Sequence, residues 1–512
     1  MKRIYDTIKY NGKLYLMNTG LLLGIYMITM NFQITSDVLY SEMIGELDHA
    51  PSFTEHIASG RYTNYLISWF YRFLNCLGVN KMHYQWVLQL LGILVYSAAA
   101  LLLYRMFEKA MKLTRYSLVL NALILVCFVN PFIVETFVYV AFDWAVGILL
   151  AVLAAQCITE KRYVIGWILA FLAVSAYQSN IIMTLQFCIA IIFITEYDNI
   201  RQLIKRVFIS GLLCVSAAGV NILIPKLGLA LHVTDEIVKQ TGVQGAWSER
   251  IYQIKMIIWL SIVKAYGMLP NYFIPLVILL AWGTTAIIIW KNADGYKKFL
   301  NIVLWSVAVL SCILVPYAPC FVSTIIGYPQ RTLISMFVGF SMILICCYYF
   351  LKDTGYLSGL FAVGTALGAA IMVYSTQTGL QDCYIANAMD FHEARQIQEA
   401  IDQYETETGN EIHTIVVHRM GSIHYIYEEQ HFEYVYTLYA HRLFYDAWAD
   451  VNLLNYMFDK DYERVNMDEL YTDNTEYYQS LIQQYWEGKS WTHLNTDEQL
   501  VFDGNTMYWA LY

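Results

Sequence analysis

The chain has 512 residues, of which 58% are hydrophobic and only 14% are charged, and its net charge is −9. Soluble domains carry charge on roughly a quarter of their residues, so this composition excludes an ordinary soluble enzyme and indicates a polytopic membrane protein. Residues 1–376 hold 26 basic and 17 acidic residues, whereas residues 377–512 hold 6 basic and 24 acidic ones. The acidic region excludes a nucleic-acid partner, because phosphate groups would repel it.

Apolar stretches follow one another along residues 1–376. A membrane-spanning helix needs about 20 mostly apolar residues, and by this measure we expect about eleven spans. They cover residues 14–33, 84–104, 116–138, 144–158, 163–177, 180–196, 207–230, 271–290, 299–318, 333–351 and 356–375. The first has basic residues before it but lacks a small-residue cleavage site, so we expect it to remain as an uncleaved span.

Basic residues mark alternate connections between these spans. They are Arg105, Lys109, Lys112, Arg115, Lys161, Arg162, Arg201, Lys205, Arg206, Lys291, Lys297, Lys298 and Lys352. Because cytoplasmic loops are enriched in Lys and Arg, the pattern predicts a multi-pass protein of the cell membrane with a cytoplasmic N-terminus. An odd number of spans then places residues 377–512 outside.

The first outer loop, residues 34–83, begins with a polar segment, ITSDVLYSEMIGELDHAPSFTEHIASGRY. Clustered carboxylates are too costly in hydrocarbon, so we expect this segment in water or in a cavity above the bilayer, as the catalytic loop. Residues 63–77 have the apolar spacing of an interfacial helix. Residues 251–269 carry two lysines on an apolar segment, which we expect either to lie in the interface or to dip into the membrane and return.

The region 377–512 has the composition of a soluble domain. We expect helices at 393–404, 443–458 and 476–486, and strands at 412–417 and 501–511. The sequence therefore predicts an extracytoplasmic α/β domain that sits directly on the last span.

Asp37 comes just after the first span, where a lipid headgroup would present itself. A partly shielded carboxylate there can have a raised pKa and act as a general base on a sugar hydroxyl. Arg61 offers a cationic fork suited to phosphate, and Gly60 lets the backbone approach a ligand closely. The simpler interpretations are a solvated aspartate and an arginine paired with a nearby acid.

Five further residues lie inside or at the edges of apolar runs: Glu135, Asp143, Tyr177, Gln178 and Arg331. Ionisable groups at membrane depth are costly and usually face a cavity or a partner. We therefore expect these residues to surround the mouth of the bundle, with helix ends solvated by water as the alternative.

Several short motifs, taken in order, resemble one family. They are ITSDVLYSE in the first outer loop, SGRY downstream, SAYQSN at the start of a later span, and an outer tail that opens with ANAMDFHEARQIQEAI. Their order and the topology are similar to the bacterial type II glucosyltransferases of the Gtr group, which belong to the glycosyltransferase C superfamily. The resemblance covers most of the chain.

The resemblance implies transfer of a sugar, usually glucose, from a polyprenyl phosphate to a cell-surface glycan on the outer face of the membrane. By this analogy Asp37 is the catalytic base, and positive charge from Arg61 and Arg331 assists the leaving phosphate. Further expected substrate-binding residues are Glu42, Tyr62, Asp143, Tyr177 and Gln178.

No Cys/His pattern for a metal is present, so no metal ligand or cofactor is predicted. Members of the family often carry two adjacent acids in the first loop, whereas Val38 follows Asp37 here and the next acid is Glu42. This departure leaves the roles of Glu42 and of a divalent cation open.

Two other functions compete with this interpretation. A polysaccharide polymerase or ligase would have several arginines in a large late outer loop, where this chain has only Arg331. A lipid-glycan flippase or transporter would show paired polar groups at mid-span and internal repeats, and the sequence shows neither.

Overall fold

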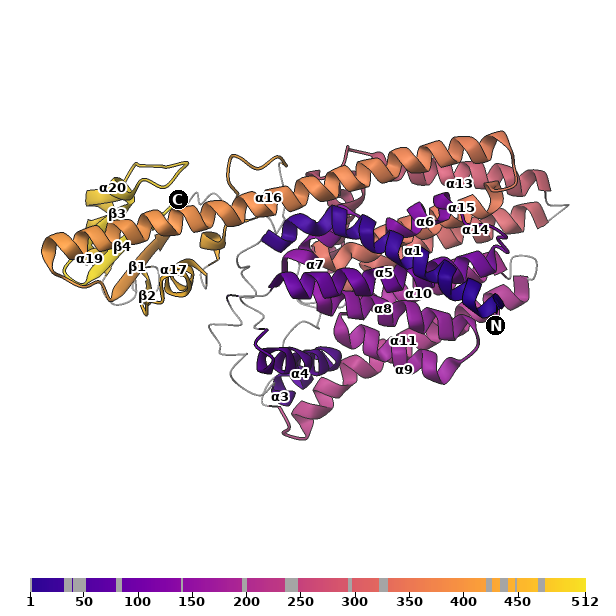
Figure 1. Ribbon diagram of the computed structural model, residues 1–512, viewed down its shortest axis with the longest axis horizontal. Helices are drawn as coiled ribbons and strands as arrows, with labels where there is room; N and C mark the ends of the chain where they lie inside the picture. Colours follow the sequence, from indigo (N-terminus) through magenta and orange to yellow (C-terminus); the bar gives the residue numbers. More distant parts are fainter. Residues whose placement is uncertain are drawn as a thin grey trace.

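The computed structural model describes residues 2–31, 39, 52–79, 85–139, 141–195, 200–234, 247–292, 297–321, 330–419, 426–432, 441–446, 449–467 and 475–512. These residues form a helical bundle and a smaller unit with a β-sheet, joined by one long helix, α16 (Tyr356–Thr408) (Figure 1). The N-terminus lies at the end of the bundle far from the sheet (Figure 1).

The helices of the bundle come first in the chain. They are α1 (Lys2–Tyr26), η1 (Met27–Asn31), α3 (Phe53–Ser59), α4 (Tyr62–Cys76), α5 (Gln85–Ala110), α6 (Leu118–Leu125), η2 (Pro131–Ile133), α7 (Val134–Tyr139), α8 (Ala141–Thr159), α9 (Tyr163–Ala176), α10 (Ser179–Thr195), α11 (Ile200–Ala230), α12 (Trp247–Ile258), η3 (Trp259–Val263), η4 (Ala265–Gly267), α13 (Phe273–Asn292), α14 (Lys297–Leu314), η5 (Val315–Phe321), η6 (Gln330–Leu333) and α15 (Ile334–Leu351).

In the described part of the chain, eight helical segments are long and apolar enough to cross a membrane. They are Tyr10–Asn31, Gln85–Ala110, Ala141–Thr159, Ile200–Ala230, Phe273–Asn292, Lys298–Phe321, Gln330–Leu351 and Tyr356–Thr408. Two shorter apolar helices, α9 and α10, lie among them. The protein is therefore a polytopic membrane protein, as its composition indicates, and the number eleven stays a prediction.

The expected single span at 116–138 is wrong, because α6 ends at Leu125 and a new helical segment begins at Pro131. The Asn130 side chain satisfies both sides of the break. Its amide oxygen accepts hydrogen bonds from Phe132 N (3.1 Å) and Ile133 N (3.2 Å), and its amide nitrogen donates to Val126 O (3.0 Å). Backbone groups buried away from water need such partners, so Asn130 allows the chain to turn inside the bundle.

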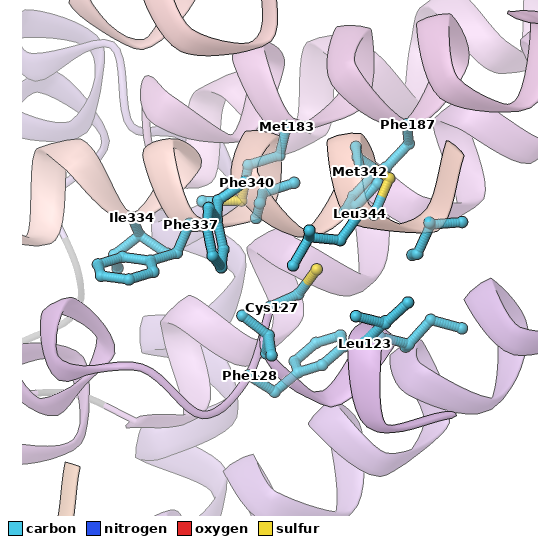
Figure 2. Close-up of a cluster of buried hydrophobic side chains, with 14 of the residues drawn as sticks. Leu123, Cys127, Phe128, Met183, Phe187, Ile334, Phe337, Phe340, Met342 and Leu344 are labelled. Atoms are coloured by element: carbon cyan, nitrogen blue, oxygen red, sulfur yellow. The ribbon is translucent and has the colours of Figure 1, made fainter. Parts of the chain in front are cut away.

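Side chains from α6 and its following turn, from α10 and from α15 form the centre of the bundle (Figure 2). Leu123, Phe128, Phe187 and Phe337 are buried there. Almost every residue of α15 is buried, so this apolar helix is enclosed by other helices. Close approach requires Gly339, because a Cβ atom there would come within 2.3 Å of Cys312 O.

The unit beyond the bundle contains a four-stranded sheet with the order β2-β1-β4-β3. Its elements are β1 (Thr414–Arg419), η7 (Leu443–Tyr445), α17 (Asp450–Phe458), β2 (Glu463–Asn466), α19 (Thr475–Leu481), η8 (Ile482–Trp486), α20 (Thr496–Gln499), β3 (Leu500–Asp503) and β4 (Thr506–Leu511). β1 pairs in parallel with β2 and β4, whereas β3 and β4 are antiparallel. The single strand expected at 501–511 is thus a hairpin, turned at Gly504, where φ is 57°.

Each face of this sheet packs against helices. Ile415, Val417 and Trp509 point to the far half of α16 and to α17, whereas Val416 and Tyr508 point to η8. This alternation follows from the two-residue period of a strand. The predicted boundary between 376 and 377 lies within α16, and the division into two domains stays a prediction.

Candidate functional site

A buried ion pair joins two elements that are distant in sequence. Glu135, in the first turn of α7, accepts hydrogen bonds from Arg331 N (2.6 Å) and from Arg331 Nη1 (2.8 Å) in η6. The Glu135 side chain is fully buried, and that of Arg331 is 29% exposed. A buried carboxylate is tolerated only when it is paired in this way, so the two residues fix the position of η6 against α7.

Tyr177 lies beside this pair. It directly follows α9, and its ring packs against Trp144 of α8 with 3.9 Å between centroids. The Tyr177 side chain has a hydrogen-bond interaction with Arg331, and the guanidinium group of Arg61 lies within electrostatic range of the same hydroxyl. Three of the expected site residues therefore belong to one electrostatically connected region.

Arg61 is held by the turn between α3 and α4. Gly60 ends α3 with φ at 69°, and Arg61 N donates to His56 O at 2.9 Å. A Cβ atom at Gly60 would approach Asn221 Nδ2 to 3.2 Å, so both the conformation and the space favour glycine. The Nε atom of Arg61 is buried and makes no hydrogen bond to any described residue.

Tyr62 and Asp143 belong to α4 and α8 and make separate contacts. The Tyr62 ring stacks on Phe171 with 5.7 Å between centroids, and burial raises the pKa of Tyr62 to about 12. Asp143 accepts a hydrogen bond from the Tyr71 hydroxyl. The Asp143–Tyr71 hydrogen bond therefore connects α8 to α4. Gln178 lies between α9 and α10 and is half-buried.

Asp37 and Glu42 lie outside the described residues. Leu39 is described, and it is 2% exposed in the core of the sheet unit together with Phe391 and Leu443. Leu39 therefore connects the segment between η1 and α3 to the sheet unit. This contact was not expected from the sequence, where Val38, Leu39 and Tyr40 form a short apolar run in a polar segment.

The sequence analysis also missed Trp144 and Tyr71. Aromatic residues are common in and near membrane interfaces, and only the contacts of Trp144 with Tyr177 and of Tyr71 with Asp143 distinguish these two. Within the described ranges, no group of three or more His, Cys, Asp or Glu side chains could hold a metal ion.

The geometry can now be compared with known proteins. The sequence model of the family described as Glucosyl transferase GtrII matches residues 46–373, about two thirds of the chain. The chain belongs to the GtrII glucosyl transferase family. This membership confirms the resemblance and makes the protein a membrane glycosyltransferase. The GtrII match includes Arg61, Tyr62, Glu135, Asp143, Tyr177, Gln178 and Arg331, whereas Asp37 and Glu42 precede it.

Searches among curated proteins and among solved structures found no match to this GtrII chain.

Proposed function

We propose that this GtrII protein transfers a glucosyl residue from a polyprenyl-phosphate donor to a glycan acceptor on the outer face of the cell membrane. The observation that carries the proposal is the Glu135–Arg331 pair, which fixes one guanidinium group beside Tyr177, with Arg61 in electrostatic range of the same hydroxyl. In such a transfer, negative charge develops on the leaving phosphate. Two fixed cations in a site shielded from water stabilise that charge in the transition state.

The proposed chemistry is a direct displacement. Asp37 takes the proton from the acceptor hydroxyl, whose oxygen forms a bond to the anomeric carbon. The bond between that carbon and the phosphate oxygen breaks, and polyprenyl phosphate leaves from the opposite face. Arg61 and Arg331 bind the phosphate, while Tyr62 and Tyr177 provide aromatic surfaces for the sugar and the lipid. The roles of Asp37 and Glu42 in this scheme rest on the family resemblance.

The proposed orientation has the first outer loop and the sheet unit on one side of the membrane. Leu39 is buried among residues of the sheet unit, which requires the two segments to share a side. α3 and α4 lie at the same end of the bundle as the sheet unit (Figure 1). Together with the basic connections, this contact supports an extracytoplasmic C-terminal unit.

The proposal is tested by glucosyl transfer in membranes supplied with polyprenyl-phosphate glucose and an acceptor glycan. We expect Asp37→Asn to insert normally and to lose transfer, and Arg61→Ala to reduce the turnover about 10²-fold or more. Glu55→Gln is the matched control, because Glu55 is an exposed acid of the same loop. Undiminished transfer by Asp37→Asn would remove Asp37 from the mechanism, and an inactive wild-type protein would reject this donor.

A further inference from the structure

A strained turn lies next to the Glu135–Arg331 pair. After α12 and η3, the consecutive residues Ala265, Tyr266 and Gly267 have φ values of 44°, 51° and 86°. The left-handed region is unfavourable for a residue with a side chain, and a conformation of this kind persists only where its surroundings enforce it. Two such residues in succession, one of them aromatic, point to a constraint on where Tyr266 lies.

The Tyr266 ring is connected to both halves of the ion pair. Tyr266 is 2% exposed, and its ring meets that of Phe132 edge to face, with 5.5 Å between centroids. Phe132 in turn contacts Phe337 in the same way, at 4.9 Å. Phe132 precedes Glu135 by about one helical turn, and Phe337 follows Arg331 in the helix that η6 opens. The three rings therefore support η2 with α7 on one side and η6 with α15 on the other.

The turn itself is held from the opposite side. Ser375 of α16 donates a hydrogen bond to Met268 O at 2.5 Å, and the Ser261 and Tyr317 hydroxyls are 2.5 Å apart. Burial raises the pKa of the Tyr266 hydroxyl, and the charge of the Glu135 carboxylate adds to that rise. The hydroxyl therefore lies within electrostatic range of the Glu135 carboxylate.

We propose that Tyr266 is a positioning residue for the transfer reaction, which fixes the direction of the Glu135 carboxylate and through it the place of the Arg331 guanidinium group. This inference rests on the proposed function. The strain in the turn is the cost of directing the Tyr266 side chain inward. The ring of Tyr266, packed against Phe132, prevents η2 from moving away from η6. Because Arg331 acts on charge that develops only in the transition state, a misplaced pair lowers kcat and leaves KM nearly unchanged.

The test compares Tyr266→Leu with Tyr266→Phe. Leucine removes the ring that contacts Phe132, whereas phenylalanine keeps that ring. We expect Tyr266→Leu to lower kcat for glucosyl transfer about tenfold, with KM within about twofold. Tyr266→Phe is expected to keep the kcat of the wild type, because the edge-to-face contact with Phe132 remains.

Three outcomes would overturn the inference: an unchanged kcat in Tyr266→Leu, an equal loss of kcat in both variants, or a loss of kcat that follows the melting temperature. A further variant, Phe132→Leu, removes the ring that links Tyr266 to α7. It should reproduce the loss of kcat in a protein that still carries the Tyr266 side chain, and a normal kcat there would also count against the inference. If the wild type transfers no glucose from polyprenyl-phosphate glucose, the proposed function fails first, whereas an active wild type with a fully active Tyr266→Leu variant rejects this inference alone.

Discussion

Glu135 receives two hydrogen bonds from Arg331, one from its backbone nitrogen and one from its guanidinium group, across 196 positions of sequence. The guanidinium group thus neutralises the charge of the carboxylate, and the backbone N–H group gives it a second hydrogen bond. It anchors the turn that carries Arg331 to the broken helix that carries Glu135. The position of Arg331 therefore depends on a contact between η6 and α7, and the sequence of neither segment alone determines that contact.

Replacing Arg331 with methionine should be costly, because it leaves a fully buried carboxylate without its cation. Breaking a buried pair by removing one partner costs about 3–5 kcal/mol. We expect a clear loss of thermal stability in detergent and a loss of glucosyl transfer. Lys352→Met is the control, since its partner Asp353 is 83% exposed and such surface pairs contribute about 0–1 kcal/mol. Equal melting temperatures for the two variants would contradict the role given to the pair.

The break at Asn130 predicts a second effect on stability. Asn130→Leu removes the acceptor for two backbone N–H groups and the donor to Val126 O. Each buried group left unsatisfied costs about 1–3 kcal/mol. Asn130→Ser keeps a capping oxygen and should be milder. The melting temperatures should follow the order wild type, Asn130→Ser, Asn130→Leu, and a stable leucine variant would show that other groups satisfy the break.

Two glycines of the bundle should respond in opposite ways to alanine. At Gly339 the new Cβ atom would lie 2.3 Å from the backbone oxygen of Cys312, so α15 would have to move away from its neighbour. At Gly283 nothing lies within 4 Å. We expect Gly339→Ala to lower the melting temperature strongly and Gly283→Ala to leave it unchanged or raise it, because alanine suits a helix better by about 0.5–1 kcal/mol. Similar melting temperatures would reject the close packing.

Thiol labelling tests the orientation of the chain. Cys76 is exposed and Cys157 is half-exposed, whereas the other eight cysteines are buried. With Cys76 and Cys157 replaced by serine, Lys489→Cys should react with a membrane-impermeant maleimide on intact cells, because Lys489 is exposed in the sheet unit. Lys109→Cys, at the other end of the bundle, should react only after permeabilisation. The reverse result would invert the proposed topology.

Hydropathy and the cost of buried charge account for what the sequence could predict. Apolar length gave most of the spans, and the expense of ionisable groups at membrane depth directed attention to Glu135, Tyr177 and Arg331. The same measure failed at 116–138, because it treats Asn130 and Pro131 as two residues in an apolar run. It takes no account of proline lacking an N–H group or of asparagine capping a chain end.

Contacts between distant segments explain the rest. No local pattern links Glu135 to Arg331 or Leu39 to Phe391, since each contact depends on how whole helices pack. The change of composition near residue 376 suggested that a helix ends there. α16 continues instead, because its interior has no proline and its buried face passes from the bundle to the sheet unit without interruption.

Because α16 is one unbroken helix, a change in the tilt of its apolar part also moves its far end. At a rise of 1.5 Å per residue, the 30 residues from Gly379 to Thr408 extend about 45 Å. A tilt of about 10° in the span would therefore swing the far tip by roughly 8 Å. Spans tilt when the surrounding bilayer becomes thinner, so we expect the thickness of the host membrane to change the sideways position of the acidic unit.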